Sequence, residues 1–178
     1  MSKKPFILAI NAISGGGKTA TTRALQKRLL NARALYFDDR NYDSDSGIED
    51  ICKWVEAGAD VNRFDLRRLA EDIDNLVKEN PDFIILDYPF GYRHKLLAPY
   101  LDYSIFIDTP LDVAMARRIL RDYEDKIISD ITDVLGGMRQ YLEQGRSAYL
   151  FGLVAARESA DFVVDGCMPV VCRLTRLL

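Results

Sequence analysis

A glycine-rich stretch near the N-terminus constrains this chain more than any other feature. Residues 13–19 read ISGGGKT and lie between an apolar run at 6–10 and a segment of helical character at about 18–30. Glycines let successive backbone N–H groups converge on an anion, along a path that side chains would block and that often needs a positive φ. The stretch therefore predicts a strand, a phosphate-binding loop and a helix whose N-terminal dipole faces the same anion.

The residues of this loop have expected roles in binding ATP and Mg²⁺. Lys18 would reach the outer phosphates, and the Thr19 hydroxyl would ligate Mg²⁺. The pattern G-x-x-x-x-G-K-[ST] begins with glycine, whereas this chain has Ala12; alanine is the next smallest residue, so we expect the fit to survive. The alternative is a glycine-rich turn that precedes Lys-Thr by chance. The other residues expected to bind the nucleotide are Ser14, Gly15, Gly16, Gly17 and Ala20.

Length and composition set further limits. The 178 residues suit one domain, 1–178, with one core. We expect no nucleic-acid partner, because the net charge is -3 and the lysine pair at 3–4 is too short to be a binding arm. No apolar run approaches the roughly 18 residues of a membrane span, and no secretory signal is present, so we expect a cytoplasmic protein without a membrane partner. The 3 cysteines lack metal-ligand spacing, and we expect them to be reduced.

Short β-rich runs alternate with longer segments of helical spacing. In the segment at 65–79, for example, Leu66, Leu69, Ile73 and Leu76 share one helix face. Continuous apolar strands that alternate with helices indicate a parallel sheet covered on both faces. The expected fold class is therefore α/β, a three-layer α/β/α sandwich. The expected strands are 6–10, 34–37, 83–86, 103–107 and 162–164.

Acidic residues follow the expected strands. The second strand ends in Asp38 and Asp39, the third in Asp87 and the fourth in Asp108. Open α/β sheets bind ligands at the carboxyl ends of their strands. Phosphoryl transfer to a hydroxyl needs a Mg²⁺ position and a carboxylate that orients and deprotonates the attacking group. Asp87 suits the metal as a Walker B acid, with a solvated strand end as the alternative, and Asp38 suits the base, although the Asp38–Asp39 pair could equally cap the next segment.

The motifs together resemble the P-loop kinases of the uridine kinase, nicotinamide riboside kinase and phosphoribulokinase group, over nearly the whole chain. The resemblance implies the P-loop nucleoside triphosphate hydrolase fold. In that group an acid after the second strand acts as the catalytic base, and the run FDDRNY at 37–42 nominates Asp38 first. A second family acid follows an aromatic residue and binds substrate hydroxyls, and Asp65 matches it. The third-strand acid is commonly Glu before Gly, whereas here Asp87 precedes Tyr88. Tyr88 and Asp39 complete the expected substrate-binding set.

A helical lid is expected at about 112–145. The run RRILRD at 117–122 resembles the arginines that close over ATP in the family. Arg117 and Arg121 stand four residues apart, so they would present two guanidinium groups on one face and neutralise the γ-phosphate. The alternative is a solvated helix face. A further family arginine after the lid helix is absent, and Lys126 is the candidate substitute.

The phosphate acceptor is less well defined. Uridine kinases carry a β-hairpin between the acid matched by Asp65 and the third strand, and its side chains hold the base. Here only about twenty residues separate Asp65 from Asp87, and one helical segment fills them, so the hairpin is absent. His94 lies beyond the third strand and is expected at the surface, with a substrate contact as the alternative. Aromatic residues that might wall a pocket, although more often core, are Tyr42, Trp54, Tyr88 and Phe90.

The sequence thus predicts an ATP- and Mg²⁺-dependent phosphotransferase that acts on a hydroxyl of a small molecule, first among them a ribonucleoside such as uridine. Another riboside, a sugar or a vitamin precursor is an alternative acceptor. A nucleotide-binding regulator without transfer activity is an alternative from a different class. A GTPase is a weaker one, because no N-K-x-D run is present. A small-molecule substrate is the expected partner, and the sequence is compatible with a homo-oligomer.

Overall fold

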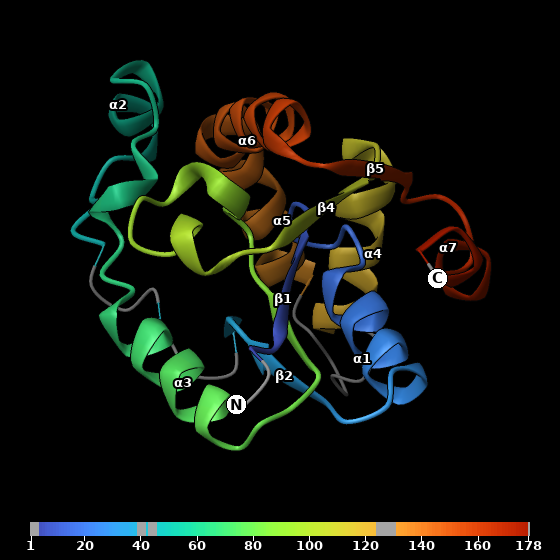
Figure 1. The fold of residues 1–178 in the computed structure, drawn as a ribbon. Coiled ribbons are helices and arrows are strands. Elements are labelled where there is room, and N and C mark those ends of the chain that lie inside the picture. The colour runs from blue at the N-terminus through green and yellow to red at the C-terminus, as the bar shows by residue number, and fades with distance from the viewer. Residues whose placement is uncertain (1–3, 39–41, 43–45, 124–130, 178) are drawn as a thin grey trace.

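The computed structural model describes residues 4–38, 42, 46–123 and 131–177 (Figure 1). Within these ranges, 5 parallel strands form one sheet in the order β2-β3-β1-β4-β5. Every expected strand is present, and only the second is displaced, because it begins and ends earlier than its apolar run. The strands are β1 (Phe6–Asn11), β2 (Ala32–Tyr36), β3 (Phe83–Asp87), β4 (Tyr103–Asp108) and β5 (Phe162–Asp165).

Helices connect the strands and cover both faces of the sheet (Figure 1). The longer helices are α1 (Lys18–Arg28), α2 (Ile51–Glu56), α3 (Arg67–Lys78), α4 (Leu111–Tyr123), α5 (Ile131–Gln140), α6 (Arg146–Ser159) and α7 (Val170–Leu177). Single turns of 3-10 helix are η2 (Val61–Arg63), η3 (Gly91–Arg93) and η4 (Ala98–Tyr100), and a π-helical turn, η5 (Tyr141–Gly145), joins α5 to α6. The described residues of the region at 112–145, in which a lid was predicted, belong to α4, α5 and η5 and are helical.

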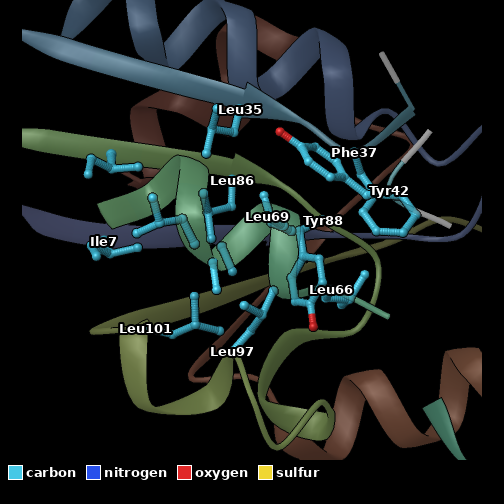
Figure 2. Close-up of a cluster of buried hydrophobic side chains, with 14 residues drawn as sticks. Ile7, Leu35, Phe37, Tyr42, Leu66, Leu69, Leu86, Tyr88, Leu97 and Leu101 are labelled. Carbon is cyan, nitrogen blue, oxygen red and sulfur yellow. The ribbon is translucent and has the colours of Figure 1, made fainter. Parts of the chain in front are cut away.

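Two buried hydrophobic clusters lie on opposite faces of the sheet. Side chains alternate between the faces of a strand, so Ile7 of β1 faces one cluster and Leu8 faces the other. The first cluster packs against α3 (Figure 2). The second packs against α1 and α7, through Leu25 and Leu174. The expected three-layer α/β/α sandwich is confirmed.

The segment between Asp65 and Asp87 contains α3 and then β3, without a hairpin. The helix begins at Arg67, and the Asp65 side chain, two residues before it, accepts a hydrogen bond from the Arg67 backbone N–H at 3.1 Å. In the described ranges, no helix combines the length and the apolar character needed to cross a membrane.

Candidate active site

The loop after β1 has a backbone that only glycine suits. Gly15 and Gly17 have φ values of +79° and +97°, in the left-handed region. A Cβ on Gly15 would lie 2.2 Å from the carbonyl oxygen of Ala114 in α4, so α4 packs directly on the loop. A Cβ on Gly16 would lie 2.6 Å from the Cβ of Ala12. The alanine at the first position of the motif is therefore accommodated because glycine stands opposite it.

Lys18, Thr19 and Asp87 converge where β1 and β3 end. The Thr19 hydroxyl donates to Asp87 Oδ2 at 2.6 Å, and Asp87 is only 4% exposed. Lys18 Nζ donates to the carbonyl oxygen of Ala12 at 3.2 Å. Burial lowers the pKa of Lys18, while the Asp87 and Asp38 carboxylates oppose that shift. A hydroxyl next to a carboxylate, at the first turn of a helix that follows a glycine loop, matches the ligand types that hold Mg²⁺ and phosphate.

A cavity of about 260 Å³ opens beside the loop. Asp38, an exposed residue just after β2, lines it together with Lys18. Trp54 of α2 and Phe90 also line it, as expected for an aromatic wall. Two further aromatic residues come from α6, Tyr149 and Phe151. The cavity thus joins the phosphate loop, a carboxylate and an aromatic surface.

Arg117 of α4 contacts the turn after β5. Its Nη1 donates to the carbonyl oxygen of Gly166, in the turn after β5, at 3.0 Å. Arg121 pairs with Asp122 at 2.7 Å, and this hydrogen bond raises the pKa of Arg121. The charge of Arg121 also contributes to lowering the pKa of Lys18. The two arginines nominated as one clamp therefore contact different parts of the site.

Arg118 lies at the loop although the sequence did not nominate it. A Cβ on Gly15 would be 3.1 Å from Arg118 Cγ. The guanidinium donates to the Tyr149 hydroxyl and lies 5.6 Å from the centroid of that ring. Arg118 and Arg121 stand three residues apart, which also places them on one helix face. This spacing could have identified Arg118 as a candidate site residue from the sequence.

The remaining acceptor candidates lie away from the cavity lining. Asp65 is exposed and bound to Arg67, whose side-chain and backbone hydrogen bonds lower its pKa to about 2. Tyr88 is 1% exposed and belongs to the cluster under α3, where burial raises the pKa of its hydroxyl (Figure 2). Asp39 and Lys126 lie outside the described residues.

His94 is buried, so the expectation of a surface position is wrong. It is 4% exposed, and its Nε2 lies 3.0 Å from the carbonyl oxygen of Phe64. Its ring stacks on Phe90, with 6.5 Å between centroids. The turn η3, just before His94, packs against β1, β4 and α6, and these tertiary contacts place the histidine in the interior. Tyr42 is likewise buried in the cluster under α3.

The chain is similar in sequence to known kinases. No protein-family model matches the chain. The uridine kinase of Streptococcus agalactiae serotype V is 27% identical over 174 residues, covering 80% of this chain and 83% of the relative. That of Streptococcus uberis is 28% identical over 177 residues, covering 82% and 84%. The resemblance to uridine kinases is confirmed. The chain is accordingly an ATP-dependent kinase.

Solved structures agree in fold. TT1252 from Thermus thermophilus has a TM-score of 0.58 at 16% identity, covering 98% of this chain and 97% of the other. A deoxyadenosine kinase from M. mycoides, solved with bound dCTP, has a TM-score of 0.56 at 16% identity, covering 97% and 96%. The fold of this kinase is therefore that of the P-loop kinases.

Proposed function

We propose that this protein transfers the γ-phosphoryl group of ATP to a hydroxyl group of a small molecule, with a ribonucleoside such as uridine as the first candidate. One observation carries the proposal: Lys18 and Asp38 line the same cavity, beside the hydrogen-bonded pair of Thr19 and Asp87. A phosphate anchor, a metal position and a carboxylate at one cavity are the parts that phosphoryl transfer requires.

In the proposed reaction Asp38 takes the proton of the acceptor hydroxyl. The hydroxyl oxygen attacks the γ-phosphorus, the bond from that phosphorus to the bridging oxygen breaks, and ADP leaves with the bond's electrons. Lys18 and the backbone N–H groups of the loop hold the phosphates in line. Thr19 and Asp87 would hold Mg²⁺, which when bound neutralises charge on the phosphate oxygens.

The arginines of α4 divide the remaining work in this proposal. Arg118 and Arg121 neutralise charge that develops on the transferred group. Arg117 binds the turn at Gly166, at the carboxyl edge of the sheet, where it supports the ATP site. Because α4 already packs on Gly15, closure of the lid would bring the guanidinium groups of Arg118 and Arg121 to the phosphates.

The similarity to streptococcal proteins named uridine kinase favours uridine as the acceptor. The segment at 65–87 favours a broader range of acceptors, because α3 occupies the place where the family carries its base-binding hairpin. Another riboside or a sugar is therefore the second candidate acceptor.

An acceptor screen tests the proposal. Purified protein, ATP and Mg²⁺ are incubated with ribosides and sugars, and ADP production is measured with and without each acceptor. We expect acceptor-dependent ADP production that Lys18→Ala abolishes, together with weaker calorimetric binding of ATP with Mg²⁺. Binding of ATP without ADP production across all acceptors would identify a regulator instead. Unchanged affinity and turnover in Lys18→Ala would refute the assignment of the loop.

A further inference from the structure

The cavity contains a cation that phosphoryl transfer does not use. Arg93, the last residue of η3, lines the cavity. Among the described residues, its side chain has one hydrogen-bond partner, the carbonyl oxygen of Ala59, which lies 3.2 Å from Nη2. The guanidinium lies over the ring of Phe151, 5.4 Å from its centroid. Arg93 is half-buried, and burial lowers its pKa, while the charge of Asp60 opposes the shift.

The charge of this lining is unbalanced. Lys18 and Arg93 bring two positive charges, and Asp38 brings one negative charge. Lys18 is matched by the phosphates of ATP, and Asp38 is used by the acceptor hydroxyl. Among the described residues that line the cavity, no further carboxylate is then left to balance Arg93; Asp60, whose charge acts on Arg93, does not line it.

An acceptor that fills the cavity also removes water from Arg93. A guanidinium carries five N–H donors, and here one of them has a protein acceptor. Desolvating the rest without a partner is costly, whereas a carboxylate or phosphate accepts two parallel hydrogen bonds from the same group. A neutral acceptor would therefore bind against a penalty that an anionic one avoids.

The neighbouring side chains suit a flat or apolar molecular body. Trp54 and Phe90 line the cavity with Phe151. The indole of Trp54 is held in place, because its Nε1 donates to the carbonyl oxygen of Asp60 at 3.1 Å. Apolar walls with a few fixed polar groups are typical of small-molecule sites, in which the polar groups set orientation.

We propose that the acceptor is an anionic small molecule whose hydroxyl meets Asp38 and whose carboxylate or phosphate group is bound by Arg93. The proposal rests on the proposed kinase function and names the acceptor class of the same site. Arg93 is thereby a specificity-determining residue.

Matched pairs of acceptors test this assignment. Orotidine and uridine differ by one carboxylate on the same neutral riboside, and fructose 6-phosphate and fructose form the phosphate arm. We expect the anionic member of at least one pair to have a kcat/KM higher by roughly 10-fold or more, the scale of one hydrogen bond between charged groups. The pair that shows the preference identifies the anion. A preference for the neutral member in both pairs would overturn the proposal.

Arg93→Gln separates recognition of charge from folding. It should lower kcat/KM for the preferred anionic acceptor by roughly 10- to 100-fold and change that of the neutral partner by less than about 3-fold. Arg93→Lys should keep part of the preference. Arg63→Gln is the matched control, because exposed Arg63 also donates to a backbone carbonyl, that of Gly47 at 2.9 Å, outside the cavity lining. Equal losses for both acceptors in Arg93→Gln would assign Arg93 a structural role and reject the proposal.

Binding provides a readout that does not depend on catalysis. Trp54 is the only tryptophan of the chain, so quenching of its fluorescence reports occupation of the cavity. We expect tighter binding of the anionic member and loss of that difference in Arg93→Gln. If no acceptor yields ADP, the kinase proposal fails, yet this titration still decides whether Arg93 selects anions. Equal affinity for both members in the unaltered protein would contradict the inference.

Discussion

Arg173 Nη1 donates to Thr21 Oγ1 at 2.7 Å, which joins α7 to α1 across 152 positions of the sequence. The guanidinium lies against the phosphate loop, since a Cβ on Gly17 would be 2.9 Å from Nη1. Arg173 is 3% exposed; burial lowers its pKa and the charge of Arg117 adds to that effect, whereas Asp165 opposes it. Through Arg173, α7 therefore holds the start of α1 and the phosphate loop in place.

Arg173→Met should lower the free energy of unfolding by about 1–3 kcal/mol, because it leaves the buried Thr21 hydroxyl without this partner. Thermal unfolding measures the change. Arg176→Met, at an exposed position of the same helix, is the control and should be close to neutral. Equal effects of the two substitutions would show that the contact with Thr21 does not account for the loss of stability.

Asp38→Asn should lower turnover by roughly 10²-fold or more, because it removes the proposed general base, while calorimetric ATP affinity stays nearly intact. Asp39→Asn should do less. Asp65→Asn should also do less, since Asp65 is bound to Arg67 and does not line the cavity. Steady-state ADP production compares the three variants. If Asp39→Asn is crippled and Asp38→Asn is not, the wrong member of the pair has been assigned as the base.

The ion pair of Asp65 predicts a pH dependence. Hydrogen bonds from Arg67 hold the pKa of Asp65 at about 2, below the value of about 3.9 of an unfolded chain. Its contribution to stability is therefore present above pH 4 and lost as the pH falls towards 2. Because the carboxylate is exposed, the effect should be small and should weaken with salt. The difference in melting temperature between the unaltered protein and Asp65→Asn should shrink over this interval, and a difference that grows on acidification would contradict the pairing.

Ribosides without a carboxylate or phosphate group should be poorly discriminated. With α3 in the place of a base-binding hairpin, the described part of the site offers the base edge mainly apolar walls, and shape alone separates small differences by about 10- to 200-fold. We expect kcat/KM for uridine, cytidine, adenosine and nicotinamide riboside to lie within roughly two decades of one another. A preference of more than about 10⁴-fold for one of them would show that another segment, such as that carrying Trp54, reads the base.

Local sequence determined the phosphate-binding loop and the strands of this protein. The glycines at 15–17 and the Lys-Thr pair that follows them specify a backbone path and its chemistry within a few residues, and the apolar runs specify strands buried on both faces. The positions of Asp38 and Asp87 were predictable for the same reason: both lie at or just beyond the carboxyl end of a strand, and parallel strands end at one edge. The missing hairpin was also predictable, because too few residues lie between Asp65 and Asp87.

Tertiary structure alone decided which of the other charged residues reach the site. Arg93 and His94 are adjacent in a segment without periodicity, yet one lines the cavity and the other is buried against Phe64, because their directions depend on how the chain after β3 packs. Arg173 comes to the loop only because α7 packs on α1, a contact between segments at opposite ends of the chain. Strand and loop propensities act over a few residues, whereas the direction of a side chain in an irregular segment is set by distant partners.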